Sequence, residues 1–134
     1  MTIVVDASFV VAALVDSGPA GTWAEQAMES EDLAAPHLMS VEAANILRRA
    51  SQSGEISVDT ASLAHADLLA LSVVYFSYEP FGARVWELRD NVTSYDAWYV
   101  AVAEHLTAPM VTLDRKLAKA SGVRCSFRVP PNYG

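Results

Sequence analysis

Short apolar runs alternate with stretches of helical periodicity along the whole chain. Strands are predicted at 3–5, 33–35, 73–76 and 110–113, with an edge strand at 127–129. Helices are predicted over 9–15, 22–31, 38–54, 57–70, 80–89, 95–106 and 116–120. Because parallel strands are joined by helical crossovers, this alternation predicts an α/β fold with helices on both faces of a mostly parallel sheet.

Polar residues mark the expected starts of the helices. Ser8 is expected to cap the first helix and Ser57 the fourth, because a side-chain hydroxyl accepts a hydrogen bond from a free backbone N–H group. The segments Thr22–Glu25 and Thr93–Asp96 have the spacing of a capping box. Pro80 is expected to open a further helix.

Length and composition indicate a single domain over residues 1–134. The chain is 52% hydrophobic and 19% charged, with a mean hydropathy of +0.22, which excludes a disordered acidic chain. The one cysteine, Cys125, excludes an intrachain disulfide framework and a cysteine-based zinc site. An apolar run of about 18 residues and a basic leader are both missing. We therefore expect a cytoplasmic protein with no membrane partner.

Charge is distributed unevenly along the chain. The net charge of −7 argues against broad nucleic-acid binding. Residues 1–114 nevertheless hold all 16 acidic residues and four arginines, whereas the last twenty residues hold five basic residues and no acidic one. This skew is typical of a chain that meets an anionic partner, and it also fits a solvated basic C-terminus.

Two aspartates follow predicted strands. Asp6 ends the first strand and Asp114 ends the fourth. The carboxyl ends of parallel strands line the crevice where α/β proteins bind ligands, so the two carboxylates are expected to face the same space. The alternative is structural: Asp6 would make an Asx-turn and Asp114 would cap the last helix.

Two further acids adjoin apolar helix faces. Asp96 heads a stripe that continues through Val100 and Ala103, where an unpaired carboxylate is costly. Glu42 has no Lys or Arg three or four residues away. The structural alternatives are that Asp96 completes its capping box and that Glu42 is an exposed residue beside the stripe.

Four converging carboxylates would need a cation. Like charges about 4 Å apart repel by roughly 1–4 kcal/mol per pair. With no cysteine cluster and three scattered histidines, the hard cations Mg²⁺ and Mn²⁺ fit such a site better than zinc. A carboxylate magnesium site commonly serves phosphoryl chemistry. Arg115, Lys116 and Lys119 follow the fourth acid and would hold a phosphodiester backbone beside it.

The sequence resembles the PIN-domain ribonucleases, and specifically the VapC-type toxins of bacterial toxin–antitoxin pairs. Four blocks carry the resemblance in family order over almost the whole chain: Val4-Val5-Asp6-Ala7-Ser8, Ser40-Val41-Glu42-Ala43-Ala44-Asn45-Ile46-Leu47, Ser94-Tyr95-Asp96-Ala97-Trp98-Tyr99-Val100-Ala101 and Val111-Thr112-Leu113-Asp114-Arg115-Lys116-Leu117. Each block is weak alone, and the identification depends on all four together.

The resemblance implies a three-layer α/β/α PIN-like fold and an acidic metal site. In it, Mg²⁺ or Mn²⁺ would be held by Asp6, Asp96 and Asp114, with Glu42 as a further ligand or orienting the attacking water. Ser8, Thr112 and Asn45 would be supporting polar residues, Thr112 on the same side of its strand as Asp114. The family cleaves RNA, commonly forms homodimers and is silenced by a VapB-like antitoxin. Lys116 stands where some relatives have another acid, which argues against a full second metal site.

Three alternatives stay open. They are a housekeeping RNA-processing nuclease, a receiver-like module that binds magnesium without cleaving RNA, and a catalytically silent scaffold of the same fold. Five aromatic residues are interpreted as core or dimer-interface residues rather than base-stacking platforms, namely Trp23, Tyr75, Phe76, Trp86 and Trp98. The roles of Tyr99 and Phe127 stay open.

Overall fold

A computed structural model describes residues 1–132. Its centre is a five-stranded sheet with the order β3-β2-β1-β4-β5, in which every neighbouring pair is parallel. The strands are β1 (Thr2–Val5), β2 (Asp32–Pro36), β3 (Val73–Phe76), β4 (Met110–Val111) and β5 (Phe127–Arg128). The predicted α/β class is confirmed, and the sheet is wholly parallel. Its carboxyl edge therefore gathers the segments that follow β1, β2 and β4.

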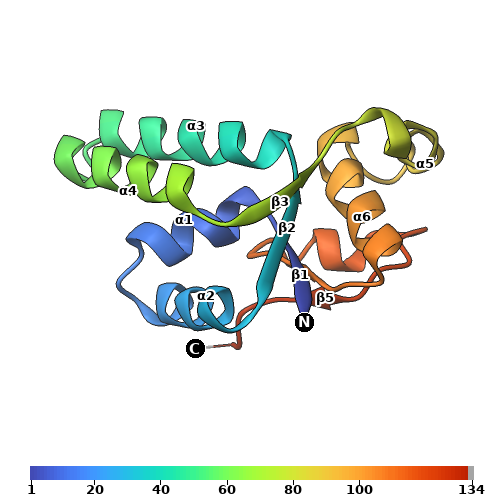
Figure 1. The fold of residues 1–134 in the computed structure, drawn as a ribbon, viewed down its shortest axis with the longest axis horizontal. Helices are drawn as coiled ribbons and strands as arrows, with labels where there is room; N and C mark the ends of the chain where they lie inside the picture. The colour runs from blue at the N-terminus through green and yellow to red at the C-terminus, as the bar shows by residue number, and fades with distance from the viewer. Residues whose placement is uncertain (133–134) are drawn as a thin grey trace.

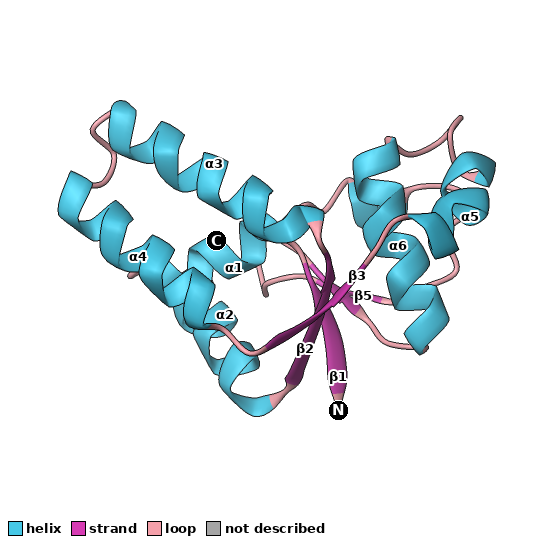
Figure 2. Ribbon diagram, turned by 45° about the horizontal axis from the view of Figure 1, so that its top comes forward, coloured by secondary structure: helices cyan, strands magenta, loops and turns pink. Residues whose placement is uncertain are grey.

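Helices cover both faces of the sheet (Figures 1 and 2). On one face lie α1 (Ala7–Val15), α2 (Pro19–Ser30), α3 (Leu38–Gln52) and α4 (Val58–Ala70), and on the other α5 (Gly82–Glu87) and α6 (Ser94–Leu106). Two 3₁₀ turns, η1 (Glu79–Phe81) and η2 (Leu117–Lys119), complete the elements. Within residues 1–132, no helix is long and apolar enough to cross a bilayer.

The core lies where β1 and α6 meet. Ile3, Val4 and Val5 of β1 are fully buried, as expected for a central strand covered on both faces. On α6, the run from Ala97 to Ala103 is buried apart from Trp98, which is partly exposed. This packing fixes β1 and α6, and with them the acids at their ends, Asp6 and Asp96.

Several helix starts differ from the sequence-based expectation. Asp6, not Ser8, caps α1, because its carboxylate accepts the backbone N–H of Phe9. The helix α2 begins at Pro19 rather than at Thr22, since proline's fixed φ and missing N–H suit the first helical position. Thr22 lies inside the helix and donates to the carbonyl of Gly18 (3.2 Å).

Other boundaries agree more closely. Ser57 caps α4 by accepting the N–H of Thr60, and Thr93 caps α6 by accepting that of Asp96. The single helix predicted over 80–89 is replaced by a 3₁₀ turn followed by α5, which ends at Glu87. The strand predicted over 110–113 ends at Val111, because the following residues turn toward Asp6.

A charged clamp ties α5 to α6. The Arg84 guanidinium donates to both carboxylate oxygens of Glu104, at 2.8 and 3.0 Å, and to the carbonyl of Gly122 at 2.7 Å. Burial alone would raise the pKa of Glu104, but hydrogen bonds from Arg84 and the backbone N–H of Arg124 outweigh it and lower the pKa. The clamp therefore stabilises the layer that carries α6.

We expect Arg84→Ala to lower the free energy of unfolding by about 1–3 kcal/mol, because a two-pronged, charge-assisted pair is removed. Since the folded pKa of Glu104 is lowered, the stabilisation is present above its ordinary pKa of 4.5 and is lost as the pH falls through the lowered value. Urea unfolding at several pH values measures both effects. Equal stability of the variant and the wild type at neutral pH would contradict the assignment.

Candidate active site

Asp6 joins the end of β1 to the start of α1. One carboxylate oxygen, Oδ1, accepts the Ser8 hydroxyl at 2.8 Å and the Phe9 N–H at 2.9 Å, and the other accepts the Thr112 hydroxyl. Burial raises the pKa of Asp6, these hydrogen bonds oppose the rise, and the nearby charge of Asp96 adds to it. The carboxylate is thus fixed in orientation but electrostatically strained.

Thr112 connects the segment after β4 to Asp6. Its side chain is fully buried. Besides donating to Asp6, its hydroxyl oxygen accepts the backbone N–H of Asp114 at 2.9 Å, while Ser8 Oγ accepts the N–H of Leu113 at 3.3 Å. Strand alternation predicts that Thr112 and Asp114 point to the same side of one strand. Because β4 ends at Val111, the two residues are instead linked by the hydrogen bond of this turn. Ser8 and Thr112 thus belong to one hydrogen-bond network around the Asp6 carboxylate.

Asp114 is exposed at the start of the basic segment. Its Oδ1 accepts the N–H groups of Lys116 at 2.9 Å and Leu117 at 3.2 Å, which is the turn-capping role considered as its structural alternative. Asp114 is nevertheless coupled to another acid, because its charge contributes to the raised pKa of Asp96. Asp114 therefore both orders the turn and belongs to the acidic group.

Asp96 lies in the first turn of α6. Its backbone N–H donates to the Thr93 hydroxyl at 3.2 Å, which gives one half of the predicted capping box. Burial raises the pKa of its carboxyl, the charge of Asp114 raises it further, and hydrogen bonding to the Thr93 side chain partly offsets both. The capping role therefore coexists with a carboxylate held among other acids.

Glu42 projects from α3 and is partly buried, not an exposed residue beside the stripe. Its Oε1 accepts the hydroxyl of Tyr99 at 2.6 Å. Burial raises the pKa of Glu42, the Tyr99 hydrogen bond opposes this, and the charges of Asp96 and Asp6 reinforce it. Sequence reasoning left Tyr99 open, although a tyrosine in a buried helix needs a partner for its hydroxyl.

The acidic group defined by Asp6, Glu42, Asp96 and Asp114 is electrostatically linked. Each member raises the pKa of another, or has its own pKa raised by one. Within residues 1–132, no ion pair reaches any of the four. Carboxylates without cationic partners match the ligand chemistry of Mg²⁺ and Mn²⁺.

The spacing of the acidic group is not that of a preformed metal site. In the part of the chain that the structure describes, no three His, Cys, Asp or Glu side chains stand close enough together to hold an ion. Asp6, Glu42 and Asp114 each accept hydrogen bonds from donors of their own. The donor set fits a hard cation, which would have to draw the side chains together.

The remaining candidate residues lie outside the group. Asn45 is exposed, and its side-chain oxygen accepts from Arg48 of the same helix at 2.9 Å. Arg115 donates to the carbonyl of Pro130, whereas Lys116 and Lys119 extend from the surface beside Asp114. The three histidines are exposed, which is one of the two placements expected for them.

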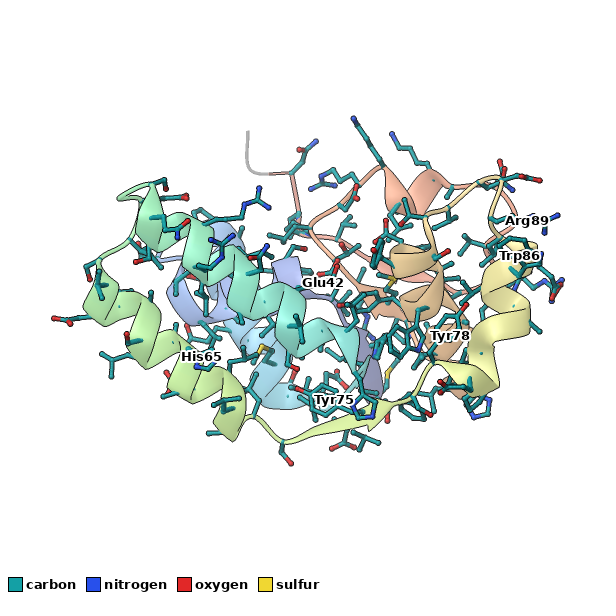
Figure 3. The ribbon with its side chains drawn as sticks, turned by 90° about the horizontal axis from the view of Figure 1, so that it is seen from above. Glu42, His65, Tyr75, Tyr78, Trp86 and Arg89 are labelled. Atoms are coloured by element: carbon teal, nitrogen blue, oxygen red, sulfur yellow. The ribbon has the colours of Figure 1, made fainter. Side chains whose placement is uncertain are left out.

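Most of the aromatic residues pack as predicted. Trp23 contacts Phe9 edge-to-face, and Phe76 packs against Phe81. Trp86 is predicted to lie in the core or a dimer interface, and it is not in the core: its side chain is 63% exposed and carries the Arg89 guanidinium over its ring, 4.8 Å from the centroid. Figure 3 shows this pair at the edge of the molecule, far from Glu42.

Known proteins resemble this chain over nearly its whole length. The family model of the PIN domain matches residues 3–123. Ribonuclease VapC1 of Mycobacterium tuberculosis is 39% identical over 130 residues, covering 94% of this chain and 96% of that protein. Ribonuclease VapC9 of the same species is 36% identical over 129 residues, with coverage of 96% and 98%. The crystal structure of Mycobacterium tuberculosis VapC20, a sarcin-ricin loop cleaving toxin, superposes with a TM-score of 0.68 at 18% identity, covering 91% of this chain and 96% of that one.

The acidic group predicts an unusual dependence of stability on pH. Because the pKa of Asp96 is raised in the folded protein, the ionised side chain costs folding free energy above that pKa, and the cost disappears as the pH falls toward the ordinary value of 3.8. In EDTA, we expect Asp96→Asn to be more stable than the wild type by roughly 1 kcal/mol at neutral pH, and this gain to shrink in mild acid.

Urea unfolding with EDTA measures the difference. Asp67→Asn, which removes an exposed carboxylate of α4, serves as the matched control and should follow the wild type at every pH. A gap between Asp96→Asn and the wild type that did not change with pH would argue against electrostatic linkage.

Proposed function

Because the chain belongs to the PIN-domain family and, within it, to the VapC ribonucleases, the toxins of type II toxin–antitoxin systems, we propose that the acidic group is its hydrolytic centre. The observation that carries the proposal is the linkage of Asp6, Glu42, Asp96 and Asp114 without a cationic partner in residues 1–132. Such a group is costly to fold unless its charge serves a ligand.

We propose that Asp6, Asp96 and Asp114 hold one Mg²⁺ or Mn²⁺ ion. Asp6 follows β1, Asp114 follows β4, and Asp96 lies in the first turn of α6, which packs against β1. When bound, the ion would polarise the phosphate, lower the pKa of a bound water and stabilise the leaving oxygen. Lys116, placed two residues after Asp114, adds positive charge where a second ion would need another acid.

The side chains of the site divide the remaining work. Asp6 is held by three hydrogen-bond donors, so it contributes a carboxylate of fixed direction. Glu42 accepts a hydrogen bond at Oε1 only, among the described residues, which leaves Oε2 to orient the attacking water. The raised pKa of Glu42 suits an acceptor of a proton from that water.

The basic C-terminal segment supports RNA as the substrate. Lys116 and Lys119 are exposed and follow Asp114 within five residues, so positive charge lies next to this acid along the chain. Lysine binds a phosphodiester backbone without reading base sequence, because its contact is to the phosphate. Arg115 extends this basic surface while one of its N–H groups is bound to Pro130.

We also propose a VapB-like antitoxin and a second copy of the chain as protein partners in the cytoplasm. Both follow from membership of the VapC ribonucleases. Exposed apolar side chains, among them Val41, Trp86 and Tyr95, leave surface on which such partners could dock.

Asp6→Asn tests the hydrolytic proposal. We expect RNA cleavage to fall by at least about 100-fold, because the substitution removes a ligand charge while its remaining oxygen can still cap α1. EDTA should abolish cleavage by the wild type, and Mg²⁺ or Mn²⁺ should restore it. Asp59→Asn, on the exposed surface of α4, is the control and should cleave normally. Full activity of a folded Asp6→Asn variant, or cleavage in EDTA, would refute the proposal.

Replacing the lysines tests the RNA surface. We expect the double substitution of Lys116 and Lys119 by alanine to raise KM for RNA and leave kcat nearly unchanged. The dependence of log affinity on log salt should become shallower by about 0.7 for each phosphate that the variant no longer binds. Binding to single-stranded RNA across a salt series measures the slope, and an unchanged slope would place the substrate elsewhere.

A further inference from the structure

Glu42 depends on one hydrogen bond for its orientation. Its carboxylate reaches the edge of the sheet from a flexible side chain on α3, and among the described residues the one hydrogen bond to it is that of Tyr99. Asp6, by contrast, is fixed by donors at both oxygens. If Glu42 is to act on a water or a metal ion in a defined direction, Tyr99 must supply that direction.

Tyr99 is suited to be a fixed donor. Its side chain is 1% exposed, so the ring is locked by packing within α6 and its neighbours. The distance of 2.6 Å between the hydroxyl oxygen of Tyr99 and Oε1 of Glu42 is that of a strong hydrogen bond to a carboxylate. Burial and the charges of Glu42, Asp6 and Asp96 raise the pKa of the phenol far above its usual value, so it remains a donor.

The bond also joins the two helical layers of the molecule. Glu42 comes from α3 on one face of the sheet and Tyr99 from α6 on the other (Figure 2). Tyr99 lies one turn after Asp96, so both side chains leave the same side of α6. The orientation of Glu42 is therefore tied to the helix that carries Asp96.

A purely structural role for the bond does not explain why its acceptor is a carboxylate. A buried phenol needs an acceptor, but a carboxylate next to Asp6 and Asp96 is an expensive one, since their charges raise its pKa and no cation pairs with it within residues 1–132. A neutral acceptor would satisfy the hydroxyl without that repulsion. Phenylalanine would fill the same volume, so packing alone does not require the hydroxyl.

We infer that Tyr99 is a positioning residue of the hydrolytic centre: its hydroxyl holds Oε1 of Glu42 and thereby directs Oε2 toward the space shared with Asp6 and Asp96. This inference rests on the proposed function for the role of Glu42. It adds a residue that acts through Glu42 and does not touch the substrate. Residues that orient metal-site carboxylates in this way typically contribute about 10–100-fold to metal affinity or activity.

The test compares Tyr99→Phe with Glu42→Ala and with the double variant. Two readouts are used, Mn²⁺ affinity of the RNA-free protein by calorimetry, and kcat and KM for RNA cleavage. Because the water that Oε2 would orient is one bound to the metal ion, losing this orientation would weaken ion binding as well as catalysis. We expect Tyr99→Phe to weaken Mn²⁺ binding about 10-fold and to lower kcat about 10–100-fold with KM little changed. In the Glu42→Ala background, adding Tyr99→Phe should cost less than about 2-fold in either readout.

Tyr78→Phe is the matched control, because it removes a phenol hydroxyl from an exposed residue that packs on Trp98 outside the acidic group. It should behave as the wild type in both readouts. Thermal unfolding shows whether the variants are folded, and all assays are run well below the lowest unfolding temperature among them.

The outcomes separate this inference from the proposed function. Wild-type levels of Mn²⁺ binding and kcat in Tyr99→Phe, or an equal loss in the presence and absence of Glu42, would overturn the role of Tyr99 even if the protein cleaves RNA. Failure of the wild type to cleave RNA would overturn the proposed function. The calorimetric arm would then still decide whether Tyr99 orients Glu42.

Discussion

The burial of carboxylates that have no cationic partner within residues 1–132 is the constraint on which this site depends. The folded chain places Asp6, Glu42 and Asp96 where burial and mutual charge raise the pKa of each, and Asp114 adds its charge to the same space. Proteins avoid such arrangements unless a ligand offsets the cost. A cation bound among these carboxylates would therefore stabilise the folded chain, and the proposed chemistry follows from that binding.

Hydrogen bonds orient three of the four carboxylates. Asp6 is held by donors from α1 and from the turn after β4, and Glu42 by a phenol from the opposite helical layer. Asp114 is held by backbone N–H groups of its own turn. Because the donors come from different layers, the site exists only when the sheet, α3 and α6 are assembled together. The Arg84–Glu104 clamp contributes by fixing the layer of α6.

Local patterns in the sequence predicted the fold class, which the structure confirms, and singled out the four acids, whose joint role stays a prediction. Parallel strands have a common carboxyl edge, so a strand-end Asp6 and a strand-end Asp114 could be expected to approach each other. Long-range partners could not be expected. Tyr99 meets Glu42 across 57 positions of sequence, and Thr112 meets Asp6 across 106, contacts that no helical or strand periodicity encodes. The side-chain partner of Asn45 was likewise not predicted: Asn45 lies one turn after Glu42 on α3 and accepts a hydrogen bond from Arg48.

A crystal structure grown with Mn²⁺ tests the acidic group as a metal site without reference to activity, because anomalous scattering locates the ion directly. We expect one Mn²⁺ peak bound by carboxylate oxygens of Asp6, Asp96 and Asp114, with these side chains drawn closer than in the metal-free chain and with the Tyr99–Glu42 hydrogen bond retained. The absence of a peak at saturating Mn²⁺, or a peak bound by other residues, would refute the acidic group as the metal site.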